Sequence, residues 1–302
     1  MTQYGYRDIV AANEAVTIFF FMQAKRVAFS AVVSMLILCG AGCIVAPVLP
    51  QQRPLAHSDG VRAEPLKPAA LKQSGEPWHS VADGVEKTVI VDKTSNVGVV
   101  LFRFASGDFS ARLVSSPQSP KSVTDWAKTV DGESMVVNGT YFNVDNSPSG
   151  FVAVGGKRVG TRKFDLDKSG LLLFTPDLRI VDTRQEKTEL DAAKLSNAAQ
   201  SYPFYVVGGQ PAISQDSGQT SRRSFIGQDQ EGRTYVGAVS DDFVSLYELM
   251  RVLTDTGIDW KNVLNLDGGP STGIVSSFGG TTDAYDSFDV VPNVIVVTRK
   301  TR

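Results

Sequence analysis

The stretch "NLDGGPSTG", residues 265–273, brings an amide, a carboxylate, three glycines, a proline and two hydroxyl side chains into one short segment. The mainly apolar residues 263–266 predict a buried strand, after which Gly268 and Gly269 turn the chain. A carboxylate at a strand end, beside flexible backbone, is well placed to be a general base, a nucleophile or a metal ligand. Asp267 could equally cap its own turn. This segment alone therefore leaves both a tight turn and a binding site open.

Further strands are predicted through the rest of the body. Runs rich in β-branched and aromatic residues, bounded by turn residues, are typical of strands. Besides the strand that leads into residues 265–273, such runs occupy residues 87–93, 96–104, 134–142, 150–156, 171–182, 234–240, 273–278 and 293–300.

Helices are fewer than strands. Residues 122–130 open with a Ser-x-x-Asp capping pattern, and residues 189–200 are Ala-rich but weakly periodic. The clearest helix is residues 245–257, where Ser245 and Glu248 form a capping box and the apolar residues share one face. A long run of strands without strict strand–helix alternation predicts a single α+β domain, strand-rich and mixed, with a few flanking helices.

The beginning of the chain predicts export. After Met22 come two basic residues at 25–26, an apolar run at 27–38 and small residues at 40–42. This is the layout of a secretory signal. Because Cys43 follows the small residues, the segment also resembles a lipoprotein signal, in which that cysteine is acylated. We expect a protein that is periplasmic, secreted or a lipoprotein of the cell envelope.

A retained membrane anchor is the alternative, because residues 27–48 are nearly long enough to span a bilayer. Residues 1–21 fit no basic n-region, so we expect the natural start at Met22. A Pro-, Gln- and Ser-bearing stretch then predicts a flexible tether. The predicted organisation is an N-terminal extension with its signal segment at 1–45, a tether at 46–84 and a folded domain at 85–302.

The composition limits the kinds of ligand and catalytic site that the protein can have. With 30 Lys and Arg against 32 Asp and Glu, the chain is no polycation for nucleic acid. Both cysteines, Cys39 and Cys43, lie in the export segment, so the body has no disulfide or thiolate metal site. The histidines, His57 and His79, fall in the predicted tether, which excludes Ser-His-Asp, Cys-His and His-rich metal sites from the domain. The remaining residue types suit glycosyl or phosphoryl substrates better than peptide bonds.

Two other segments combine polar groups with glycine. In "VVNGTYFN", Asn138 ends an apolar run before Gly139 and Tyr141, and such an aromatic ring can pack on the face of a sugar. The alternative is a strand that ends in a turn, with its aromatics in the core. In "YPFYVVGGQPAI", Gly208 and Gly209 could let the backbone approach a ligand or could form a hairpin.

Arginine supplies the remaining candidate group. The segment "SRRSFIG" holds Arg222 and Arg223, and the planar fork of arginine matches the oxygens of a phosphate. Strand alternation would let only one of them face a pocket. The alternative is a solvated pair of charges.

In their order along the chain, these segments resemble the phosphodiester glycosidase family, whose pattern runs NGGFF, PxG, GGxP, RTxIG, NLDGGGSS and PN. The matching segments are "NGTYF" from Asn138, "PSG" from Pro148, "GGQP" from Gly208, "RSFIG" from Arg223, "NLDGGPST" from Asn265 and "VPN" ending at Asn293. The resemblance covers roughly residues 85–302. It departs from the pattern at Thr140, Tyr141, Ser224 and Pro270. Since proline lacks an N–H, an anion cradle at this turn has one donor fewer.

The resemblance implies hydrolysis of a sugar-1-phosphodiester. A phosphate monoester is a good leaving group, because its second pKa is about 6. Its departure needs little proton donation, so the reaction does not require a histidine. The implied roles are a phosphate clamp for Arg223 and a base or nucleophile for Asp267. Asn138 and Thr272 would orient sugar hydroxyls. Other implied substrate-binding residues are Gly139, Tyr141, Gly208, Gly209, Asn265, Gly268, Gly269 and Ser271.

Two alternatives stay open at this point. One is an envelope protein that binds carbohydrate without turnover, and the other is a metal-assisted phosphodiesterase that cuts P–O rather than C–O. The cofactor is unknown, with a divalent metal still open. The expected partners are a glycosyl-phosphate or polysaccharide substrate and the membrane, reached through an N-terminal anchor or lipid, with no nucleic acid.

Overall fold

The computed structural model describes residues 74–75, 77–186 and 190–300. The predicted signal segment, with Cys43, and most of the predicted tether lie outside this range. Within it, no helix combines the length and apolar character needed to cross a membrane.

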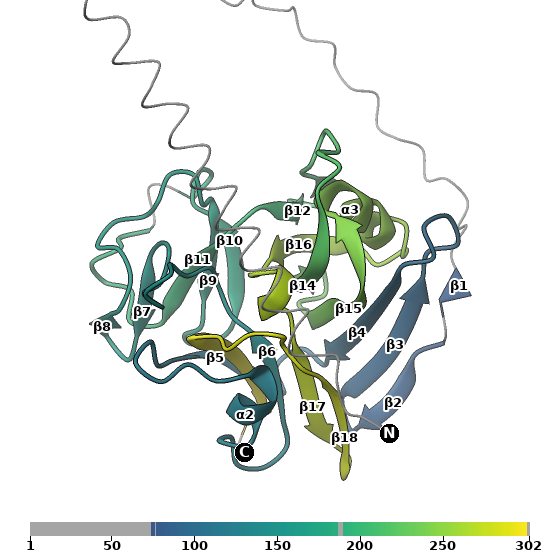
Figure 1. Ribbon diagram of the computed structural model, residues 1–302, viewed down its shortest axis with the longest axis horizontal. Helices are drawn as coiled ribbons and strands as arrows, with labels where there is room; N and C mark the ends of the chain where they lie inside the picture. The colour runs from purple at the N-terminus through teal and green to yellow at the C-terminus, as the bar shows by residue number, and fades with distance from the viewer. Residues whose placement is uncertain (1–73, 76, 187–189, 301–302) are drawn as a thin grey trace, which may run out of the picture. The chain divides into compact units, whose positions relative to one another are not determined.

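Three antiparallel sheets make up most of the described chain (Figure 1). The first has nine strands: β1 (Ser74–Gly75), β2 (His79–Ala82), β3 (Val85–Val91), β4 (Gly98–Phe104), β12 (Phe204–Val207), β13 (Gln210–Pro211), β14 (Thr220–Asp229), β15 (Thr234–Ser245) and β16 (Trp260–Asn265). The second comprises β5 (Phe109–Ser115), β6 (Ser134–Asn138), β17 (Ile274–Phe278), β18 (Thr281–Tyr285) and β19 (Asn293–Arg299). The third comprises β7 (Val152–Val154), β8 (Lys157–Arg158), β9 (Gly170–Leu173), β10 (Arg179–Asp182) and β11 (Ala198–Ser201). Within the described residues, helical turns are limited to α2 (Val123–Ala127), α3 (Leu246–Thr254) and the 3-10 turn η1 (Gly269–Ser271).

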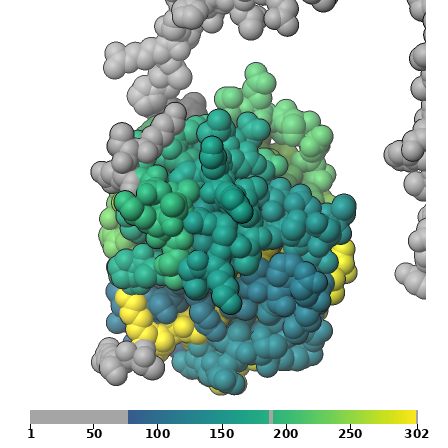
Figure 2. Space-filling view, turned by 90° about the vertical axis from the view of Figure 1, so that its left-hand side faces the viewer, coloured from purple at the N-terminus to yellow at the C-terminus, as the bar shows by residue number. Residues whose placement is uncertain are grey.

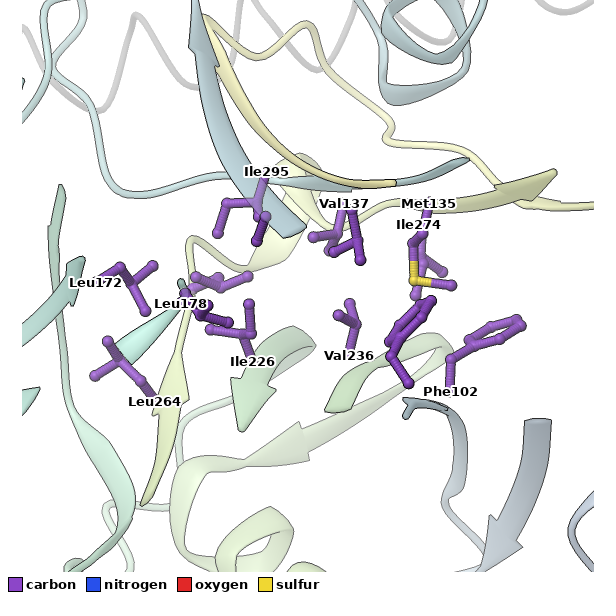
Figure 3. Close-up of a cluster of buried hydrophobic side chains, with 14 of the residues drawn as sticks. Phe102, Met135, Val137, Leu172, Leu178, Ile226, Val236, Leu264, Ile274 and Ile295 are labelled. Carbon is purple, nitrogen blue, oxygen red and sulfur yellow. The ribbon is translucent and has the colours of Figure 1, made fainter. Parts of the chain in front are cut away.

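The main core lies between the first two sheets. In Figure 3, Met135 and Val137 of β6 point toward Phe102 and Val236 of the first sheet. Side chains of a strand alternate between faces, so Val136 points the other way and packs with α2. Helix α3 covers the outer face of the first sheet. The third sheet adds Leu172 to the core, and the teal part of the chain that carries it covers much of the face seen in Figure 2.

The strand-rich part of the fold prediction is confirmed, and every predicted strand segment contains a strand. The two capped helices are also confirmed, with Ser122 bonding the backbone of α2 and Ser245 and Glu248 forming the capping box of α3. The α+β label is supported only loosely, because the described residues contain so little helix. The helix predicted at residues 189–200 is wrong. Its last part belongs to β11, where buried pairing with β7 and β9 overrides the helix propensity of alanine.

The sheet begins before the predicted boundary at residue 85. Strand β2 pairs with β3, with His79 opposite Lys87. The ring of Trp78 lies edge-on to Tyr235, and the Arg103 guanidinium sits 4.1 Å from its centre. The prediction that His79 belongs to the tether is therefore wrong, because the apolar area of Trp78 holds this segment on the sheet.

Candidate functional site

The ends of β6 and β16 and the middle of β14 meet at Asp267. Its N–H donates to the oxygen of Gly139, just after β6, at 3.0 Å. Its main-chain oxygen accepts from Asn138 Nδ2 at 2.5 Å and from Ser224 Oγ on β14 at 3.0 Å. Residues from two different sheets therefore fix the backbone of Asp267.

The carboxylate of Asp267 is partly buried and hydrogen-bonded within its own turn. One oxygen accepts from the Gly268 N–H at 3.1 Å, and the Ser271 hydroxyl also bonds the carboxylate. Burial raises the pKa of Asp267 above its ordinary value, although the bonds from Ser271 and Gly268 act in the opposite direction. A carboxylate with a raised pKa is suited to proton transfer near neutral pH.

Arg223 approaches the same turn from β14. Its Nε donates to the oxygen of Val244 at 3.3 Å, and one terminal nitrogen, Nη2, donates to that of Gln219 at 3.1 Å. The other terminal nitrogen, Nη1, lies beside Gly268, where an added methyl group would be 3.6 Å away from it. Among the described residues Arg223 has no ion-pair partner. The structure thus leaves a fixed guanidinium next to the turn that carries Asp267, with its charge available to an anion.

Tyrosines lie near the turn that carries Asp267. Asn265 Nδ2 donates to the Tyr141 hydroxyl at 2.6 Å, and Asn265 Oδ1 accepts from Tyr205 at 2.7 Å. The rings of Tyr141 and Tyr202 are 4.8 Å apart. Burial, followed by the nearby charge of Asp267, raises the pKa of Tyr141, so its hydroxyl stays neutral. These contacts build an aromatic wall beside Asp267.

Tyr202 and Tyr205 were missed by the sequence reasoning, which considered the segment "YPFYVVGG" for its glycines. No local pattern marks these tyrosines, because the pairing of this segment with the strand before Asp267 brings them to the site. In the structure Phe204 lies opposite Leu264, which brings Tyr202 to the end of β16 that leads into the turn.

Several predicted binding residues are too buried to touch a substrate. Asn138 and Thr272 have 0% exposure, and Asn138 uses both polar atoms, on the Asp267 oxygen and on the Gly273 N–H. The predicted contacts with sugar hydroxyls do not fit this burial. Gly139 packs so closely that a methyl group there would lie 1.8 Å from Asn293 Oδ1. Asn265 is likewise buried. These four residues therefore support the turn from the interior of the protein.

Gly208 and Gly209, which were predicted to bind substrate, also lie elsewhere. Gly208 and Gly209 form the turn between β12 and β13, bonded to Asn262 and Lys261 at the start of β16. Asp267 follows the opposite end of that strand. At about 3.3 Å per residue, the two ends are roughly 20 Å apart, so the pair lies outside the site.

The side chains around Asp267 do not suit a divalent cation. Such ions prefer several oxygen ligands, whereas the charged group beside this turn is the Arg223 guanidinium. Across the part of the chain that the structure describes, no three His, Cys, Asp or Glu side chains gather where they could hold a metal.

Comparisons with known proteins identify the family and the fold. A family model described as phosphodiester glycosidase matches residues 131–298. The catalytic domain of zebrafish N-acetylglucosamine-1-phosphodiester alpha-N-acetylglucosaminidase, auto-inhibited by its pro-peptide, has a TM-score of 0.54 at 18% identity, over 76% of this chain and 88% of that one. A hypothetical protein from Synechocystis has a TM-score of 0.52 at 15% identity; the match covers 72% of this chain but only 62% of that one. No curated protein matches. At such identities the structural likeness shows the fold alone.

Proposed function

We propose, on the premise that this chain belongs to the phosphodiester glycosidase family, that it hydrolyses the glycosidic bond of a sugar-1-phosphodiester. The observation that carries the proposal is the placement of Arg223 Nη1 beside Gly268, the residue that follows Asp267. A fixed cation from β14 beside the turn that carries a carboxylate matches a substrate whose anionic phosphate is attached to the carbon under attack.

Each group then has a defined task. Arg223 binds the phosphate through charge-assisted N–H bonds, which strengthen as the leaving group gains charge. The C–O bond to the sugar breaks with its electron pair passing to the phosphate oxygen. In the general-base route, water supplies the new oxygen at that carbon and its proton passes to Asp267. In the nucleophilic route, Asp267 first takes the place of the phosphate and water releases the sugar afterwards.

The aromatic wall supplies the place for the sugar. Tyr202 is 38% exposed and stacks on Tyr141, whose pKa is sensitive to the charge of Asp267. A sugar packed on these rings would present its anomeric carbon toward the carboxylate and its phosphate toward Arg223. We extend the proposal to an exported enzyme acting on envelope or extracellular polysaccharide, which rests on the predicted signal segment.

Hydrolysis in ¹⁸O-labelled water tests the proposal. The full-length chain is incubated with a panel of sugar-1-phosphodiesters, with Asp267→Asn as the control. Label in the released sugar supports C–O cleavage. Label in the phosphate, with turnover that requires an added metal, would favour a phosphodiesterase. Binding of sugar without any turnover would favour a carbohydrate-binding protein.

A further inference from the structure

Phe288 combines high exposure with a fixed position. Its side chain is 77% exposed, yet the Arg222 guanidinium lies 3.9 Å from the ring centre. The N–H groups of Phe288 and Asp289 both donate to the oxygen of Pro270, at 2.8 and 3.1 Å. A cation thus covers one face of the ring, and the backbone of its loop is tied to the turn that follows Asp267.

Arg222 is an unusual support. It is only 3% exposed, and one terminal nitrogen donates to the main-chain oxygen of Asp286 at 3.0 Å. The Nε and Nη1 groups have no hydrogen-bond partner among the described residues. The carboxylates of Asp241 and Asp286 act on Arg222 only through space. Because burying unpaired N–H groups is unfavourable, the contact with the ring is a main compensating interaction for this guanidinium.

The loop of Phe288 is also held from the other side. The Val123 N–H of α2 donates to Ser287 Oγ at 3.1 Å. Single exposed apolar side chains are common on proteins, but most are not held on both flanks and backed by a buried arginine. Such a ring presents a flat surface at little entropic cost, which is what stacking on a ligand requires.

The position of Phe288 relative to Arg223 suggests the ligand. Arg222 and Arg223 are consecutive on β14, where a register shift between Ser221 and Arg223 interrupts the regular alternation of side chains. Arg223 Nη1 lies at Gly268, two residues before Pro270. A phosphate on Arg223 would have its second ester group free to run along the turn toward Phe288. We propose that Phe288, backed by Arg222, is a stacking platform for a ring in the leaving group of the diester, either a nucleobase or a sugar. This inference rests on the proposed function.

Selectivity between leaving groups tests the platform. For full-length wild type and Phe288→Ala, kcat/KM is measured on diesters that share one glycosyl group and carry methyl phosphate, a hexose phosphate or a nucleoside monophosphate. Loss of one stacked base corresponds to roughly a fivefold to hundredfold effect. We expect a loss in that range for a ring-bearing leaving group and little change for the methyl one. Phe288→Tyr should restore the preference. The matched control is Phe243→Ala, which removes another exposed phenylalanine, 64% exposed on β15.

Equal losses on all substrates, or no loss on any, would overturn the platform. Binding separates this result from failure of the proposed function. Affinities of wild type and Phe288→Ala are compared for uridine monophosphate, a hexose 6-phosphate and methyl phosphate, without any turnover. If no diester is hydrolysed, the proposed function fails, but tighter binding of one ring-bearing phosphate that Phe288→Ala removes still supports the platform and identifies the ring. Identical affinities in both proteins count against it.

Discussion

Asn138 Nδ2 lies 2.5 Å from the main-chain oxygen of Asp267, although the two residues are 129 positions apart in the sequence. The Oδ1 atom of the same side chain accepts from the Gly273 N–H at 3.2 Å. The buried side-chain amide of Asn138 therefore hydrogen-bonds both ends of the turn that carries the carboxylate. Asn138, which the family resemblance assigns to ligand binding, therefore stabilises the backbone of the site from the interior of the protein.

Asn138→Ala should weaken both the fold and the site. The change leaves the Gly273 N–H without its acceptor, while the Asp267 oxygen keeps the Ser224 hydroxyl. An unsatisfied buried group costs about 1–3 kcal/mol. We expect a drop of that order in the free energy of unfolding, measured in urea, together with a lower kcat. Asn143→Ala, an exposed asparagine just beyond β6, is the control and should change neither. Full stability in Asn138→Ala would contradict the supporting role.

Asp267→Asn should abolish turnover while the protein still folds. Removing a general base or nucleophile lowers the rate by roughly a hundredfold to ten-thousandfold or more, and the amide keeps an oxygen for the Gly268 N–H. The assay is kcat on the best diester, with thermal unfolding to show that the fold is intact. Activity near that of wild type would remove Asp267 from the mechanism.

The same variant gives a stability prediction whose sign follows from the raised pKa of Asp267. Below its unfolded-state pKa, Asp267 is protonated in both states and has no effect of this kind. As pH rises to the higher folded-state pKa, the unfolded chain releases its proton more readily, so stability falls. Asp267→Asn removes this penalty. Its melting temperature relative to wild type should therefore be higher at pH 7 than at pH 3, and the reverse order would show that burial does not dominate.

Ser271→Ala should move the pH profile. The Ser271 hydroxyl lowers the pKa of Asp267 against the larger effect of burial, so its removal lets that pKa rise further. If Asp267 must be ionised to act, the acid limb of kcat/KM shifts to higher pH. Ser277→Ala, which removes a β17 hydroxyl that hydrogen-bonds Thr282, should leave the profile in place. A shift of the alkaline limb to higher pH, with the acid limb unchanged, would mean that Asp267 acts in its protonated form.

Most of the secondary structure could be predicted because it is determined by residues that are close together in the sequence. The capping box of Ser245 and Glu248 needs only four consecutive residues, and the sequence around β6 alternates between two buried faces. The order of motifs similarly indicated the family. The Ala-rich residues 189–200 failed because pairing with β7 and β9 is a long-range contact that no local pattern contains.

The site was harder to predict because a motif does not say which side of a strand end faces the substrate. Asn138 and Thr272 lie within the motifs but are sealed. Tyr202 belongs to no motif, yet it stands beside Tyr141 because β12 pairs with β16. Arg223 could be preferred over Arg222 only through the resemblance, and nothing local predicted that Arg222 would stack on Phe288.

Arg223→Lys should raise KM and lower kcat together. Lysine keeps the charge, but it lacks the planar fork that is held by the oxygens of Val244 and Gln219. Loss of a positioned donor typically lowers the rate by roughly a hundredfold to a thousandfold. The test is steady-state kinetics on a diester, with Arg251→Lys on the exposed side of α3 as the control. Unchanged kinetics for Arg223→Lys would place the phosphate elsewhere.

Gly208→Ala tests whether Gly208 is needed for the backbone conformation of its turn or for ligand binding. Gly208 has φ +58, and an added methyl group would meet nothing within 4 Å. The left-handed backbone conformation alone costs a non-glycine residue about 1–2 kcal/mol, so we expect a small loss of stability in urea. Because the β12–β13 turn lies at the far end of β16 from Asp267, kcat/KM should stay within a factor of two or so of wild type. A large loss of activity at preserved stability would return Gly208 to the substrate site and show that the ligand reaches past the strand.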